Sequence, residues 1–170
     1  MGSSVVLVGH GRRRRQQTGR DEAGVSSDED VLVRRYRCRE CGAVVVVMPR
    51  GMRPRLRYRV VSIVHGLALW AGGLASAAVR ARISSTTSVA HNASRYWSSL
   101  ARWLRLSAQW VGGPLQGSSR AERVEDLLQR LAARATGAGH TGQLTRDALR
   151  AAEQLGGHGA YAVGERVSTN

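Results

Sequence analysis

The sequence contains no lysine and no phenylalanine, and only 12 of its 170 residues are acidic. The carboxylates cluster in one stretch only, residues 21–30, which disfavours acidic metal cages and catalysis by paired carboxylates. Two cysteines are too few for the disulfide framework of a small secreted protein. No serine–histidine–acid set stands out, and no glycine-rich phosphate loop carries the required lysine. These absences favour a binding protein, and we expect no enzymatic activity.

The chain also lacks the arrangement of a signal peptide, because its apolar run, residues 5–8, precedes the arginine cluster 12–15. We therefore expect a cytoplasmic protein. One stretch, residues 60–79, has no formal charge over 20 positions, which is the length that a membrane-spanning helix requires. The adjacent Gly72 and Gly73 instead favour a turn between two short buried helices. A small membrane-associated protein with one transmembrane helix at 60–79 is the alternative hypothesis.

All 26 basic residues are arginines, and the formal net charge is +14. The excess is uneven: residues 1–59 hold 14 arginines and 6 acids, residues 60–120 hold 6 arginines and no acid, and the remainder is balanced. Abundant arginine without lysine is typical of a GC-rich genome, but that bias does not explain the uneven placement. A positive electrostatic potential of this kind favours the binding of polyanions, either nucleic acid or an acidic membrane surface.

Hydrophobic patterning predicts an α+β, mostly helical protein. Short β-branched runs at 5–8, 31–36 and 44–48 are typical of strands. Helical periodicity begins near residue 58, and a second short helix, with Ser76 as its N-cap, is expected at 75–83. A third helix is expected at 93–110, a fourth opens at the capping box formed by Ser119 and Glu122, and a fifth spans 145–155.

The expected organisation has three regions. Residues 1–57 form an incomplete, zinc-ribbon-like β region, 58–112 a three-helix unit of helix-turn-helix type, and 113–170 a helical tail. The last fifteen residues are glycine-rich and are expected to be frayed. The tail helix around 124–131 either caps the core or mediates a homodimer, and the sequence does not choose between these roles.

Cys38 and Cys41 are spaced so that two thiolates can bind one zinc ion, and Gly42 allows the tight turn that such a knuckle needs. A closed zinc site needs four ligands, and the chain has no second pair of this kind. His10, His65 and His91 lack diagnostic spacing. Zinc binding at an incomplete site, a free or redox-active pair, and a vestigial knuckle all remain open.

The expected helix at 93–110 carries one uninterrupted polar stripe opposite an apolar, tryptophan-bearing face. The stripe consists of Arg95, Ser98, Arg102, Arg105 and Gln109. Such a helix fits DNA recognition, in which arginines reach phosphates or guanine edges. It also fits an amphipathic helix on an anionic membrane, or an ordinary surface helix. The order of three short helices, with the stripe on the third, favours DNA.

Further arginines are expected to contact phosphates. They are Arg53, Arg55, Arg57 and Arg59 in the linker that follows the strands, and Arg80 and Arg82 in the second helix. The cluster at 12–15 is either a phosphate-binding patch or a solvated charge run near a flexible end.

The segment from Val33 through both cysteines to Tyr58, followed by an apolar helix and a Trp/Arg helix, resembles the N-terminal region of bacterial insertion-sequence transposases and related stand-alone uncharacterised proteins. In that family a zinc ribbon precedes a helix-turn-helix, and a Gly–Arg motif corresponds here to residues 9–12. The first cysteine pair and the acidic catalytic domain of the family are absent from this sequence. The resemblance therefore implies DNA binding without strand transfer, by an accessory module, a regulator or a remnant of a mobile element.

Overall fold

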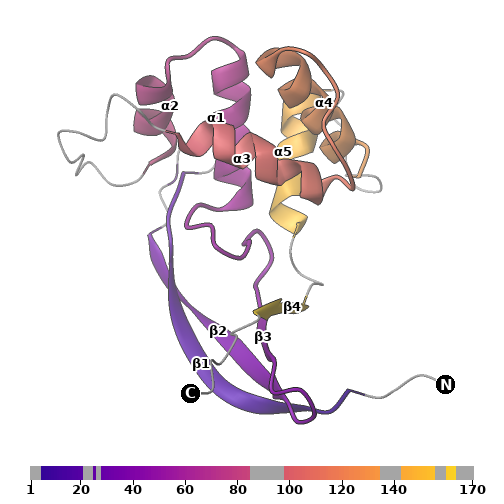
Figure 1. Ribbon diagram of the computed structural model, residues 1–170. Coiled ribbons are helices and arrows are strands. Elements are labelled where there is room, and N and C mark those ends of the chain that lie inside the picture. Colours follow the sequence, from indigo (N-terminus) through magenta and orange to yellow (C-terminus); the bar gives the residue numbers. More distant parts are fainter. Residues whose placement is uncertain are drawn as a thin grey trace.

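A computed structural model places a small antiparallel sheet beneath a bundle of five helices, so the chain is α+β as expected (Figure 1). It describes residues 5–20, 25, 28–84, 98–134 and 143–155, together with the backbone of 160–163. The strands are β1 (Leu7–Gln17), β2 (Glu29–Cys38), β3 (Val44–Val47) and β4 (Ala160–Val163). The helices are α1 (Val60–Ala71), α2 (Ser76–Ile83), α3 (Ser99–Ser107), α4 (Arg120–Ala132) and α5 (Leu144–Gln154), and a 3-10 turn, η1 (Ala108–Trp110), follows α3.

The strands lie in the order β1-β2-β3-β4, and each neighbouring pair is antiparallel. β1 is longer than the apolar run at 5–8 predicted, because it continues through the arginine cluster 12–15, paired with β2. The cluster is therefore ordered strand rather than a run near a flexible end. The prediction of a frayed C-terminus is wrong at 160–163, where β4 pairs with β3.

A β-bulge interrupts the pairing of β1 with β2. Gly9 lies opposite Tyr36, whereas Arg12 lies opposite Arg34, so His10 and Gly11 together occupy one step of the ladder. Gly11 has a φ of 85°, the left-handed conformation that this kind of bulge requires. Because side chains alternate along a strand, the extra residue decides which arginines share a face of the ribbon.

The main core lies between the helices and is built around α1, whose Ile63, Val64 and Leu67 are fully buried. α1 ends at Ala71 and the chain turns at Gly72 and Gly73, as the sequence indicated. The stretch 60–79 is therefore two helices and not the single span of the membrane hypothesis. In the part of the chain that the structure describes, no helix is long and apolar enough to cross a bilayer.

The tail helices complete this core from within the same chain. Val124, Leu127 and Leu131 of α4 are buried in the cluster that α1 forms with α5. The predicted capping box opens α4: the Ser119 hydroxyl accepts from the Glu122 amide at 3.1 Å, and Glu122 Oε2 accepts from the Ser119 amide at 3.1 Å. The Ser119 amide, together with the amide and hydroxyl of Ser118, donates to the Glu122 carboxylate and holds its pKa below the ordinary value. Ser76, expected as an N-cap, is instead the first residue of α2, and Ala75 precedes it as the cap.

Backbone hydrogen bonds fasten the end of β1 to the helices. The Thr18 amide donates to the Arg57 carbonyl at 3.0 Å, and the Arg59 amide donates back to the Thr18 carbonyl at 3.2 Å. The Arg20 amide donates to the carbonyl of Ile83, the last residue of α2, at 3.0 Å. The Ser62 hydroxyl of α1 donates to the Arg20 carbonyl at 2.8 Å. We call residues 18–20 the junction, because they fix where the β1–β2 ribbon leaves the helical unit.

Candidate nucleic-acid interface

Helix α3 displays part of the predicted polar stripe. Ser98, Arg102, Arg105 and Gln109 are exposed, while Trp103 and Leu100 are buried on the opposite side. Arg95 lies outside the described residues, as does the expected start of the helix at 93; the described helix begins at Ser99. The exposed guanidinium groups of α3 are free to meet a ligand from solvent, because the helix is held by its apolar side.

The linker, residues 50–59, runs alongside α3 in the opposite direction. The Tyr58 ring packs edge-on against Trp103, with ring centroids 5.0 Å apart. At the other end the Arg53 guanidinium lies 6.0 Å from the ring centroid of Trp110. These two contacts hold the linker against the tryptophan-bearing side of α3, so the arginines of both segments belong to one packed unit.

The six arginines predicted outside α3 differ in accessibility. Arg55, Arg57 and Arg82 are exposed, whereas Arg53, Arg59 and Arg80 are half-buried. Arg57 also donates a hydrogen bond to Gln16 Oε1 of β1, so the linker contacts the ribbon as well as α3. We name the exposed arginines Arg55, Arg57, Arg102 and Arg105 the α3–linker surface.

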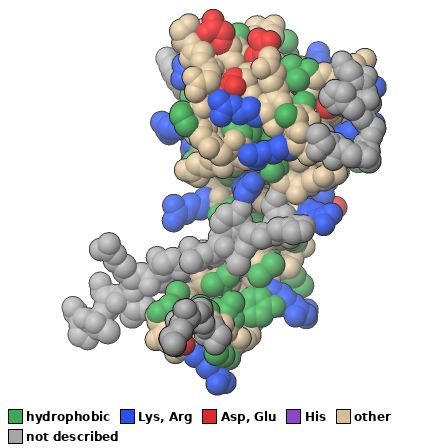
Figure 2. Space-filling model, turned by 90° about the vertical axis from the view of Figure 1, so that its right-hand side faces the viewer, with side chains coloured by type: hydrophobic (Ala, Val, Ile, Leu, Met, Phe, Trp, Pro, Cys, Tyr) green, Lys and Arg blue, Asp and Glu red, His purple; other side chains and the backbone are tan. Residues whose placement is uncertain are grey.

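The segment of chain that supplies this surface carries charge of one sign, whereas the nearest acids belong to the start of β2. No acid occurs between Cys41 and Ala121 in the sequence. The exposed arginines of the α3–linker surface form no ion pair with a carboxylate of the described chain. In Figure 2 the visible carboxylates gather mainly at the end of the helical unit far from the sheet, while arginines surround the waist between helices and sheet. The surface is therefore a candidate site for an anion.

The turn between β2 and β3 has the geometry of a cysteine knuckle. The Cys38 amide donates to the Ala43 carbonyl at 2.8 Å, and the Gly42 amide donates to the Cys38 carbonyl at 3.1 Å. Gly42 takes a φ of 71°. The backbone amide and the thiol of Cys41, with the amide of Glu40, donate to Cys38 sulfur and lower the pKa of that thiol. Cys38 is buried and Cys41 is exposed.

This donor set does not by itself fit a closed zinc site. Among the described residues, no three or more His, Cys, Asp or Glu side chains are grouped as metal ligands would be. His10 and His65 are not brought to the knuckle, and His91 lies outside the described residues. The two thiols can therefore supply half of the four ligands that a structural zinc ion needs.

Removal of metal is expected to leave the thermal stability of the helical unit unchanged, with a midpoint shift below about 2 °C in EDTA. The reason is that the main core consists of apolar side chains from the linker onward and includes neither cysteine. Differential scanning calorimetry with and without the chelator measures this, with a Cys38→Ser/Cys41→Ser variant as the control. A drop of about 4–8 °C, which corresponds to roughly 1 kcal/mol in a small domain, would show a complete structural site.

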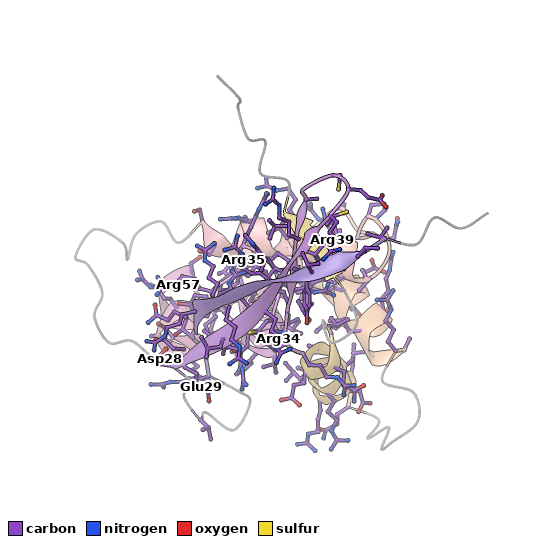
Figure 3. The ribbon with its side chains drawn as sticks, turned by 90° about the horizontal axis from the view of Figure 1, so that it is seen from below. Asp28, Glu29, Arg34, Arg35, Arg39 and Arg57 are labelled. Carbon is purple, nitrogen blue, oxygen red and sulfur yellow. The ribbon has the colours of Figure 1, made fainter. Side chains whose placement is uncertain are left out.

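Sequence reasoning named the cluster at 12–15 in β1 as a possible phosphate-binding patch, but it did not single out the arginines of β2. Arg34 and Arg35, adjacent in β2 and labelled in Figure 3, belong to opposite faces of the sheet because strand side chains alternate. The sequence did contain a signal for the exposed face. Val31 and Val33 lie on the covered face of β2, so the residues that alternate with them, such as Leu32 and Arg34, lie on the opposite face.

Comparisons with protein-family models, with curated proteins and with solved structures found no match for this chain. The class of the molecule is therefore defined by its own architecture: an α+β protein with a basic surface between its sheet and its helices.

Proposed function

We propose that the protein is a DNA-binding module that contacts the duplex through the α3–linker surface, without catalytic activity. The observation that carries the proposal is the exposure of Arg102 and Arg105 on α3, and of Arg55 and Arg57 on the linker that packs against this helix, with no ion pair to a described acidic residue. Each arginine offers a charged fork of donors that matches a phosphate oxygen pair.

In this proposal α1, α2 and α3 act as a helix-turn-helix unit, with α3 as the helix that enters the major groove. Ser98, which precedes α3, and Gln109, in the turn η1 that follows it, are both exposed and would make shorter polar contacts. By its spacing in the sequence, Arg95 belongs to the same expected stripe. Arg82 of α2 adds a phosphate contact at the edge, and the half-buried Arg53, Arg59 and Arg80 contribute positive potential.

Electrostatic binding of this kind has a measurable signature. Each arginine that neutralises a phosphate releases a condensed counterion, so the logarithm of the association constant falls linearly with the logarithm of salt concentration. The slope counts the contacts at about 0.9 per phosphate. It therefore reports on arginines near DNA rather than on the overall fold.

The Arg102→Ala/Arg105→Ala variant is expected to bind a mixed-sequence duplex more weakly and to reduce the salt slope by about 1.8. Fluorescence anisotropy of the full chain, titrated from low to physiological salt, measures both quantities. The matched control is Arg123→Ala/Arg146→Ala, which removes the same charge from exposed positions of α4 and α5. An α3 variant that behaves like this control would overturn the proposed surface.

A further inference from the structure

The two faces of the β1–β2 ribbon are covered unequally. One face carries Val33, which is buried with Met48 and Met52, so the chain leaving the sheet lies against it. The other face is open: Leu32 is 53% exposed and Val47 is 44% exposed. We call this the outer face. Seen from below in Figure 3, the ribbon lies in front of the helices.

Three arginines share the outer face. Arg12 lies directly opposite Arg34, and Arg14, two positions further along β1, lies opposite Leu32. All three arginine side chains are exposed. The bulge at residues 10–11 produces this arrangement, because the extra residue puts Arg12 in register with Arg34 instead of with Val33.

This arrangement of charge is unfavourable in the protein alone. Like charges directly opposite each other on an antiparallel pair repel. None of the three arginines forms an ion pair or a side-chain hydrogen bond with a described residue. Asp30, opposite Gln16 near the end of the same face, forms no ion pair with a described arginine. A polyanion would convert this repulsion into attraction.

The shape of the ribbon fits duplex DNA. β3 pairs only with Arg34–Arg37 of β2, so the ribbon is two strands wide from Leu32 toward the junction. The major groove of B-DNA admits a two-stranded ribbon. The two-stranded part begins beside the Arg12–Arg34 pair and ends at Gln17, and it extends roughly 16 Å along β1 at about 3.3 Å per residue, about half a turn of the double helix.

We propose that the outer face of the β1–β2 ribbon is a second DNA-binding surface, in which Arg12, Arg14 and Arg34 contact phosphates along a groove. This inference rests on the proposed function and extends it from the helical unit to the sheet. The ribbon and the α3–linker surface are held in fixed relation by the junction, since Thr18 and Arg20 bond to the linker and to α2. The protein thus contacts duplex DNA through the sheet as well as through the helical unit.

The test replaces the facing pair by threonine, as Arg12→Thr/Arg34→Thr in the full chain. Threonine suits a strand and forms favourable cross-strand pairs, so the unfolding midpoint of this variant is expected to be equal to or higher than that of the unmodified protein. Binding of a 30-base-pair mixed duplex is expected to weaken, with a salt slope lower by about 1.8. The control is again Arg123→Ala/Arg146→Ala, which carries the same net charge as the ribbon variant.

Three outcomes would overturn the inference, and they are distinguishable. If the ribbon variant matches the control while Arg102→Ala/Arg105→Ala lowers the slope, the proposed function stands and the ribbon surface fails. If the unmodified protein does not bind duplex even at low salt, both fail. If sedimentation equilibrium shows a dimer that the ribbon variant abolishes, while its salt slope is unchanged, the outer face is an interface between two copies of this chain.

Discussion

Replacement of Gly19 by alanine is expected to lower the free energy of unfolding by about 3 kcal/mol, from backbone strain and steric overlap together. Gly19 has a φ of 140°, a conformation that side chains disfavour. A methyl group there would lie 2.8 Å from Ser62 Cβ and would overlap the Ser62 hydroxyl. That hydroxyl bonds to the Arg20 carbonyl, so the substitution acts on the junction itself.

Alanine substitutions at two other glycines distinguish the cost of backbone strain from the cost of steric overlap. Gly73 has a φ of 96° but open space around it, so Gly73→Ala tests backbone strain alone and is expected to cost about 1 kcal/mol. Gly9 has neither a positive φ nor a close neighbour, and Gly9→Ala is expected to change stability by less than about 0.5 kcal/mol. Urea unfolding followed by tryptophan fluorescence ranks the three variants. A Gly19→Ala variant no less stable than Gly73→Ala would show that β1 does not pack against α1 as described.

The junction also links stability to the proposed function. The ribbon and the helical unit have separate apolar clusters, one around Val33, Met48 and Met52 and the other around α1. The small cluster has only these three buried side chains among the described residues, which is too little apolar area to hold the ribbon in place by burial alone. The contacts at residues 18–20 therefore position the arginines of the outer face relative to those of α3.

Local signals in the sequence predicted local structure correctly. The capping box at Ser119 and Glu122 opens α4, and the pair Gly72–Gly73 separates α1 from α2, because each depends on residues that are neighbours in the chain. Runs of valine predicted β2 and β3 for the same reason, since branched side chains favour extended backbone.

Long-range pairing is what the sequence did not reveal. Arginine has no strong intrinsic preference for β-strands. Residues 12–15 form part of a strand because they pair with β2. β4 forms in a glycine-rich terminus because β3 offers an unpaired edge. The packing of the linker against α3 likewise depends on the contact between Tyr58 and Trp103, which are far apart in the chain. The surface made by these segments could therefore not be assembled from spacing alone, although its α3 arginines were identified.

The contact between Tyr58 and Trp103 underlies the second prediction of a large loss of stability. Trp103→Ala is expected to lower the free energy of unfolding by about 4 kcal/mol, because truncating a buried tryptophan removes a large apolar area and leaves a cavity. Trp103 is 4% exposed and supports both Leu56–Tyr58 of the linker and the apolar side of α3. A loss of this size is a large part of the roughly 5–15 kcal/mol that holds a typical domain folded.

The matched control is Trp70→Ala, which truncates the same side chain type at a half-buried position, where Arg120 lies 4.5 Å from the ring centroid. We expect a smaller loss there, about 1–2 kcal/mol, since less area leaves the core. Trp103→Phe keeps an aromatic edge against Tyr58, and it should therefore retain most of the salt slope for DNA as well as a cooperative urea transition. Equal losses for the two alanine variants would mean that α3 is not held against the linker, and the surface built from both would have to be abandoned.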